Sequence, residues 1–196
     1  MRNNQLRVLV GTALLTAVIV VLQVVVGGIS VGPFTITLSL IPMIIGAIMY
    51  GPISGAFLGA VLATLILIAS LTGKDAGGLI LITAKPGTTT IVIYLKTTLA
   101  GLFAGLAYNA LQDKNEFWAV IVAAVLAPVT NTGLFSIACA TFFADIVSGW
   151  AAAAGYSATL TYIVLGLVGI NFLVEVGLNV LLVPAINAIV QASRKA

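Results

Sequence analysis

Residues 41–63, IPMIIGAIMYGPISGAFLGAVLA, form an apolar run that contains a complete helix–turn–helix. The pair Gly51-Pro52 marks the turn, because proline lacks a backbone donor and is tolerated in the first turn of a helix but rarely further in. The sequence therefore predicts one helix that ends near Tyr50 and a second that begins at Pro52.

The second of these helices carries small residues at every fourth position, at Gly55, Gly59 and Ala63. Residues four apart lie on one face of a helix, so these three form a flat stripe along which another backbone can approach closely. We expect the stripe to be a helix-packing seam inside the bundle.

The composition identifies the class of protein. Hydrophobic residues make up 61% of the 196 residues and charged residues 7%, with a mean hydropathy of +1.24. A soluble domain has roughly 45–50% apolar and ~25% charged residues. The apolar runs lack the alternation of barrel strands, so the spanning elements should be helices. We expect an all-α integral membrane protein, residues 1–196 forming one membrane domain.

Apolar length and breaks predict a bundle of six transmembrane helices, at residues 8–26, 38–50, 52–71, 91–111, 117–144 and 160–190. The second is short for a span. The longest polar break is residues 72–90, and a loop of this length is more often functional than idle. Its central LILIT sequence predicts a short element lying over the mouth of the bundle, as a lid. Residues 112–116 and 145–157 form the other late breaks.

An even number of spans places both termini on one side. Of the basic residues outside the spans, five fall on the terminal side and two on the other: Arg2, Arg7, Lys114, Arg194 and Lys195 against Lys74 and Lys85. Because cytoplasmic loops carry the excess of Lys and Arg, we expect both termini to be cytoplasmic in a plasma-membrane protein. So few charges form no basic patch, which argues against a nucleic-acid partner.

Ionisable residues inside apolar helices are costly, so Lys96 and Glu175 are the strongest indications of function. Asn171, Glu175 and Asn179 recur every four residues and should point inward together. Lys96 would lie ~8 Å below the outer end of a helix that began at residue 91. An alternative for Lys96 is that its side chain extends to the outer membrane interface. An alternative for the three polar residues of the predicted helix 160–190 is that they hydrogen-bond to neighbouring helices and hold the bundle together.

Catalytic chemistry has little support. Residues 28–32 match G-x-S-x-G, but they follow a membrane helix rather than a strand, and the chain has no histidine to act as base. With one cysteine and no histidine, a metal site is not expected. Gly73-Lys74-Asp75 lacks the remainder of a phosphate-binding loop. The chain is predicted not to be an enzyme, and uphill transport would need an ion gradient or partner subunits.

In order and over all six helices, the chain resembles a substrate-binding S component of an energy-coupling factor (ECF) vitamin transporter. The resemblance is carried by the Ala13-x-x-x-Ala17 stripe, IPMIIGAIMYGPISGAFLGA at 41–60, YLKTTLAGLFAGLAY at 94–108 and NFLVEVGLNVLLVPAI at 171–186. It implies that a membrane scaffold subunit docks on Ala13 and Ala17. It also implies that two partner ATPase subunits use ATP to drive transport. No cofactor is expected in this chain.

The polar side chains indicate the kind of substrate. The chain offers cations, amides and hydroxyls on the pocket side, with Tyr94 and Trp150 among the few aromatics: Lys85, Lys96, Asn131, Asn171, Thr130 and Thr132. A buried carboxylate needs a charge partner, whereas a flat ring needs stacking surface. Among the vitamins that the resemblance implies, pantothenate fits best, with Lys96, or Lys85 from the lid, on its carboxylate.

The alternative function is a self-sufficient secondary carrier or channel.

Overall fold

The structure, a computed structural model, describes the backbone of residues 2–25, 30–31, 34–35 and 38–195, and side chains at 5–25, 38–169 and 172–192. Apart from one short strand pair, β1 (Ser30–Val31) with β2 (Phe34–Thr35), the described elements are helices. In chain order these are α1 (Arg2–Val25), α2 (Leu40–Tyr50), α3 (Pro52–Leu71), α4 (Ala76–Ala84), α5 (Pro86–Leu111), α6 (Glu116–Thr141), α7 (Ala144–Ala153), α8 (Thr159–Thr161), the π-helix η1 (Tyr162–Val168), α9 (Gly169–Leu181) and α10 (Val183–Lys195).

Among the described residues, five helical segments are long and apolar enough to cross a membrane: Gln5–Val25, Pro52–Leu71, Pro86–Leu111, Glu116–Thr141 and Thr159–Leu181. The helix α2 has 11 residues, or about 17 Å at ~1.5 Å per residue, against a hydrocarbon core of ~30 Å. The all-helical membrane architecture is therefore confirmed, but the predicted count of six spans is not.

Three predicted boundaries were wrong because turns within apolar sequence leave little trace in composition. The break at 72–90 contains a helix, α4, and ends at Pro86, which begins α5 five residues earlier than predicted. The break at 145–157 contains most of α7. The predicted sixth helix, 160–190, is observed as α8, η1 and α9 in unbroken succession, followed after Leu182 by α10.

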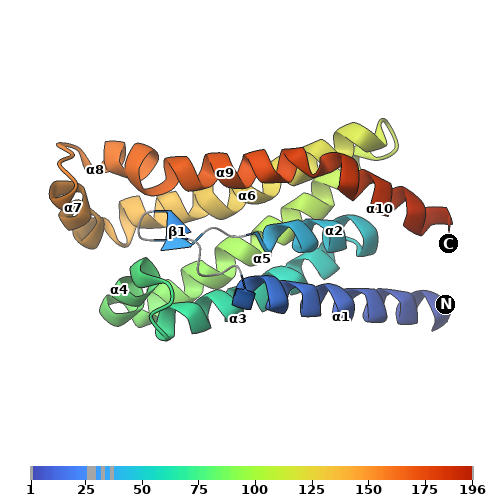
Figure 1. The fold of residues 1–196 in the computed structure, drawn as a ribbon, viewed down its shortest axis with the longest axis horizontal. Helices are drawn as coiled ribbons and strands as arrows, with labels where there is room; N and C mark the ends of the chain where they lie inside the picture. Colours follow the sequence, from blue (N-terminus) through green and yellow to red (C-terminus); the bar gives the residue numbers. More distant parts are fainter. Residues whose placement is uncertain (1, 26–29, 32–33, 36–37, 196) are drawn as a thin grey trace.

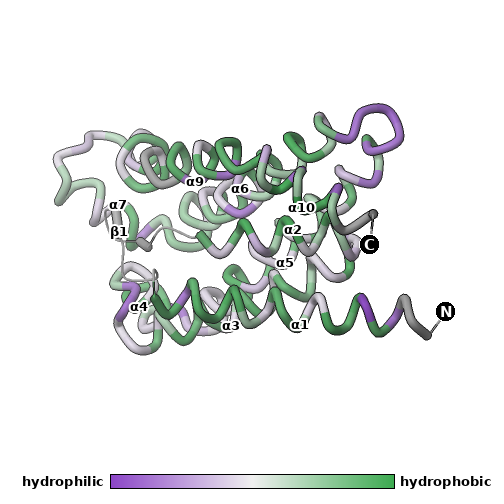
Figure 2. The backbone as a smooth tube through the Cα atoms, turned by 45° about the vertical axis from the view of Figure 1, so that its right-hand side comes forward, coloured by the Kyte–Doolittle hydropathy of each residue, from purple (hydrophilic) through white to green (hydrophobic). Residues whose placement is uncertain are grey.

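The two ends of the bundle differ. In Figure 1 the N-terminal end of α1 and the C-terminal end of α10 lie at one end, whereas α4 and α7 lie at the other. Figure 2 shows hydrophobic residues along the helices and hydrophilic ones concentrated near the ends of the bundle, including the turn around α4. The main core joins buried side chains of α1, α2, α3, α5, α6 and α10.

The small-residue stripe on α3 is a packing seam, as predicted. A Cβ added at Gly59 would overlap the carbonyl oxygen of Thr97 on α5, and one added at Gly101 would overlap the carbonyl of Gly55. Ala63 is fully buried in the same core. The absence of side chains at these glycines lets the α3 and α5 backbones touch.

We expect Gly59→Ala to destabilise the protein, because the added methyl group forces α3 away from the Thr97 carbonyl. Overpacking of this kind costs about 1–3 kcal/mol. Thermal unfolding of the purified protein in detergent measures the loss. The matched control is Gly133→Ala on α6, where an added Cβ meets nothing within 4 Å; a loss as large in the control as at Gly59 would contradict the seam.

Candidate functional site

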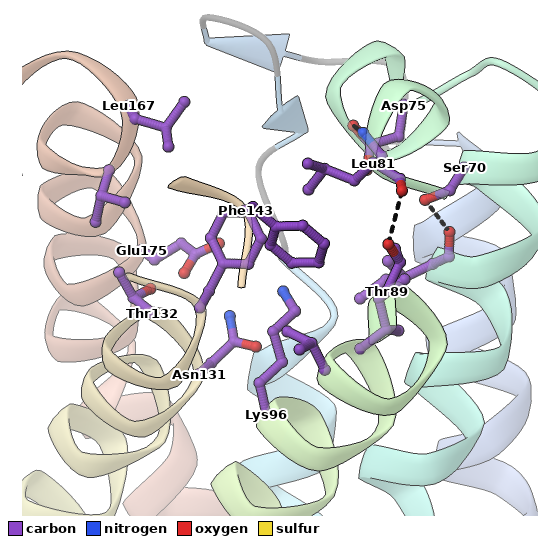
Figure 3. A pocket seen from close by; sticks show the side chains of 16 residues that line it. Ser70, Asp75, Leu81, Thr89, Lys96, Asn131, Thr132, Phe143, Leu167 and Glu175 are labelled. Carbon is purple, nitrogen blue, oxygen red and sulfur yellow. Dashed lines mark hydrogen bonds between the residues drawn. The ribbon is translucent and has the colours of Figure 1, made fainter. Parts of the chain in front are cut away.

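A cavity lies between α3, α4, α5, α6, η1 and α9 (Figure 3). Its lining includes Asp75, Gly78 and Leu81, which belong to α4 and its N-cap, at the end of the bundle opposite the two termini (Figure 1). Its empty space, which includes the part open to solvent at its mouth, is about 760 Å³. Its lining residues are Ile66, Ser70, Asp75, Gly78, Leu81, Thr89, Val92, Ile93, Lys96, Asn131, Thr132, Phe135, Phe143, Leu167, Val168 and Glu175.

Lys96 enters the cavity from the middle of α5. Because α5 begins at Pro86, Lys96 follows ten residues later, about 15 Å along the helix at ~1.5 Å per residue rather than the ~8 Å expected. Its ammonium points into the cavity near Asn131 (Figure 3) and lies 5.1 Å from the centroid of the Phe135 ring. This is a cation–π distance. The side chain therefore reaches the cavity, not the lipid interface of the alternative interpretation.

Asn131 supplies a polar group that the protein leaves unpaired. Its side chain is 4% exposed, and its Oδ1 atom has no hydrogen-bond partner among the described residues. It lies on α6 shortly after Pro128, with Thr132 next to it on the cavity wall. Leaving a buried acceptor unpaired costs ~1–3 kcal/mol. The site therefore suits a molecule that donates a hydrogen bond to this oxygen.

Two buried carboxylates complete the polar lining. Glu175 on α9 is 6% exposed, and Asn179 on the same face is also buried, so the predicted inward orientation of these two is confirmed. Asp75, also 6% exposed, caps α4 by accepting a hydrogen bond from the Gly78 amide at 3.2 Å. Burial is the largest influence on the pKa of Asp75 and raises it, although the Gly78 amide and the Lys96 charge act in the opposite direction.

The sequence reasoning missed Asp75 and the rings of Phe135 and Phe143. Asp75 falls within the predicted break at 72–90, although an aspartate before a helical apolar segment is a recognisable N-cap. Phe143 is fully buried and lies in the centre of the cavity view, above Lys96 (Figure 3). Phe143 lies between α6 and α7, directly before the first residue of α7. No pattern in apolar sequence distinguishes such a phenylalanine from those facing lipid, so no sequence signal pointed to it.

Two predicted site residues do not line the cavity. The Lys85 ammonium donates to the Phe142 carbonyl at 2.8 Å and to Asp145 Oδ1 at 2.9 Å, joining the α4–α5 turn to the start of α7. This hydrogen bond from Lys85 lowers the pKa of Asp145. The Tyr94 hydroxyl lies 2.9 Å from Thr64 Oγ1, between α5 and α3. The side chain of Asn171, on α9, is outside the described residues.

Ala13 and Ala17 lie on the exposed face of α1, whereas Thr12 and Ile19 on the same helix are buried against the bundle. The stripe is therefore not an internal packing seam of this chain. Much of the rest of the exposed face of α1 is apolar, including Leu9, Leu14 and Val21. Docking of a partner on this face stays a prediction.

Among the described residues, no group of three or more His, Cys, Asp or Glu side chains could hold a metal ion. The cavity instead combines one ammonium, two carboxyl groups, an amide and hydroxyls with apolar walls. Such a lining can bind and orient a small polar molecule.

Comparison with known proteins gives one match. The family model described as "ECF transporter, substrate-specific component" matches residues 7–187. No curated protein and no solved structure matches the chain. Because the matched region covers nearly the whole sequence, including every helix that lines the cavity, the chain belongs to the family of ECF transporter substrate-specific components.

Proposed function

We propose that this protein is the S component of an ECF-type ABC importer that binds pantothenate from the extracellular side. Membership of the family makes the chain a substrate-specific transport subunit and not an enzyme. In the proposed complex, a transmembrane scaffold subunit and two ATPases that use ATP move the bound vitamin inward. No observation favours the alternative of a self-sufficient carrier or channel.

The observation that carries the proposal is the joint position of Lys96 and Asn131 in one buried cavity. A cation and an unpaired amide oxygen are costly inside a membrane protein, and such groups commonly mark substrate paths. A ligand that brings a carboxylate to Lys96 and a hydrogen-bond donor to Asn131 Oδ1 compensates both.

Pantothenate has the required groups. Its carboxylate would pair with Lys96, and its hydroxyl and amide groups would bond to Asn131, Thr132, Asn171 and Glu175. Its dimethyl-substituted carbon suits an apolar wall such as Leu167. We assign the carboxylate to Lys96 and not to Lys85, because the Lys85 ammonium is already bonded to Phe142 and Asp145.

The proposed orientation places both termini in the cytoplasm. The ends of α1 and α10 lie together, opposite α4 and α7 (Figure 1), and five basic residues of the sequence belong to the terminal side. In this orientation α4, which contributes to the cavity lining, lies at the extracellular end of the bundle, from which an importer must take its substrate.

Lys96→Ala should weaken pantothenate binding at least a hundredfold, because removing one partner of a buried charge pair costs about 3–5 kcal/mol. Isothermal titration calorimetry of the purified protein measures the change. Lys74→Ala and Lys85→Ala are matched controls that remove a lysine outside the cavity lining, and they should bind within a few-fold of the parent. Parent-like binding by Lys96→Ala would refute the carboxylate assignment. A parent that ignores pantothenate but retains a flavin would refute the substrate.

Ala13→Trp or Ala17→Trp should abolish assembly with the scaffold subunit, and hence uptake, while binding by the isolated protein stays intact. A large side chain at a close helix contact separates the backbones, and both positions are exposed in the isolated chain. Co-purification of the complex and ligand titration give the two readouts. If binding is lost together with assembly, the stripe serves the fold of this chain instead.

Segment 72–90, the proposed lid, should become more resistant to proteolysis when pantothenate is bound. Its residues Thr72, Gly73 and Lys74 are exposed, whereas Asp75, Gly78 and Leu81 are buried at the cavity. Occupancy should suppress local opening of α4, and so should slow cleavage by a protease of broad specificity. Equal cleavage rates with and without ligand would contradict the proposal that segment 72–90 closes over the ligand.

A further inference from the structure

The cavity contains more acidic than basic side chains. Among its described lining residues the charged groups are Asp75, Glu175 and Lys96, so two carboxyl groups face one ammonium. Both acids are 6% exposed. The formal charge of the empty site, with both acids ionised, is thus one negative unit before any ligand arrives.

These three groups come from three sides of the cavity. Figure 3 shows Glu175 entering from α9, Asp75 lying by α4 on the opposite side, and the Lys96 ammonium rising between them from α5. The Lys96 charge is near enough to both acids to interact with each. One ammonium therefore interacts with two carboxyl groups, and a ligand carboxylate would be the third acidic group near it.

The other groups around Asp75 offer no compensating charge. Ser70 on α3 and Thr89 on α5 are neutral hydroxyls that line the same cavity, and β2 has no ionisable residue in its sequence. Lys74, next to Asp75 in the chain, is on the exposed side. The Cys139 thiol on α6 is buried near Lys96.

Lys85 and Asp145 neutralise each other outside the cavity. A bound carboxylate in this low-polarity site would therefore leave excess negative charge, and such charge is costly unless it is paired or neutralised.

We propose that the cavity takes up its anionic ligand together with one proton, and that Asp75 holds this proton. The inference rests on the proposed function, because it requires a carboxylate ligand. The proton comes from solvent and binds one oxygen of the Asp75 carboxylate. The other oxygen continues to accept the Gly78 hydrogen bond that caps α4, so the fold is unchanged. Both acids are equally buried. Burial is the largest influence on the pKa of Asp75 and raises it, whereas the Gly78 amide, the Lys96 charge and the Ser70 hydroxyl lower it. The Asp75→Asn variant below tests the choice of Asp75 over Glu175.

The sign of the pH dependence follows from linkage. Since the occupied site holds more protons than the empty one, lower pH favours binding. The apparent Kd rises with pH, by at most tenfold per pH unit, between the pKa of Asp75 in the empty site and its higher pKa in the occupied site.

The test is isothermal titration calorimetry of the full chain with pantothenate in two buffers of different ionisation enthalpy, repeated between about pH 6 and about pH 8. The dependence of the observed heat on the buffer gives the number of protons taken up. We expect an uptake above zero and at most one proton per ligand, and a Kd that increases with pH.

Asp75→Asn removes the titrating group and keeps the helix cap, because asparagine is as good an N-cap as aspartate. This variant should bind pantothenate with no proton uptake and a Kd that does not change with pH. Asp113→Asn, at the exposed turn between α5 and α6, is the matched control and should keep the parent's proton uptake.

Pantothenate binding by the parent without proton uptake would overturn the inference and leave the proposed function standing. Unchanged uptake in Asp75→Asn would also overturn it. A parent that binds no pantothenate overturns the substrate assignment, and this inference with it.

Discussion

The direct contact between the α3 and α5 backbones fixes the geometry of the site. Gly59 of α3 faces the Thr97 carbonyl of α5, and Lys96 is the residue before Thr97. The contact therefore sets both the depth of Lys96 in the bundle and the direction from which it enters the cavity. The same α3 helix ends at Leu71, shortly before Asp75 begins the cap of α4. A shift along this seam would move the cation relative to the carboxylate that faces it.

The opposite wall of the cavity is formed by less regular helices. Pro128 lies inside α6 and cannot donate a backbone hydrogen bond to the preceding turn, which locally loosens the helix one turn before Asn131 and Thr132. The π-helix η1 then presents Leu167 and Val168, and α9 presents Glu175. π-Helical turns are rare and are frequent at functional sites. The cavity thus lies between the closely packed α3–α5 seam and a wall that includes a proline-containing helix and a π-helix.

The sequence was informative where a residue was out of place in hydrocarbon. Lys96, Asn131, Thr132 and Glu175 are polar groups in apolar helices, and all four line the cavity. Their binding role remains a prediction. The sequence offered Lys85, in the predicted lid, as the alternative to Lys96 for the ligand carboxylate. Its partners Phe142 and Asp145 lie 57 and 60 residues further along the chain and could not be foreseen. The boundary between α9 and α10 falls within apolar sequence, so composition did not reveal it. Apolar residues that line the cavity also could not be distinguished in sequence from those that face lipid.

The polar groups that face the empty cavity make the folded protein less stable than apolar groups would. Within the described part of the chain Asn131 Oδ1 is buried without a hydrogen-bond partner, and the Lys96 ammonium lies 5.1 Å from the centroid of the Phe135 ring. Each of these two groups has a higher free energy in the empty cavity than it would have in water. A ligand that pairs with them gains from interactions that the folded chain has already oriented, so little conformational entropy is lost on binding. The buried amide oxygen and ammonium therefore lower the stability of the empty protein and raise its affinity for a ligand with matching groups. Because such a ligand binds the folded chain and not the unfolded one, it also restores the lost stability.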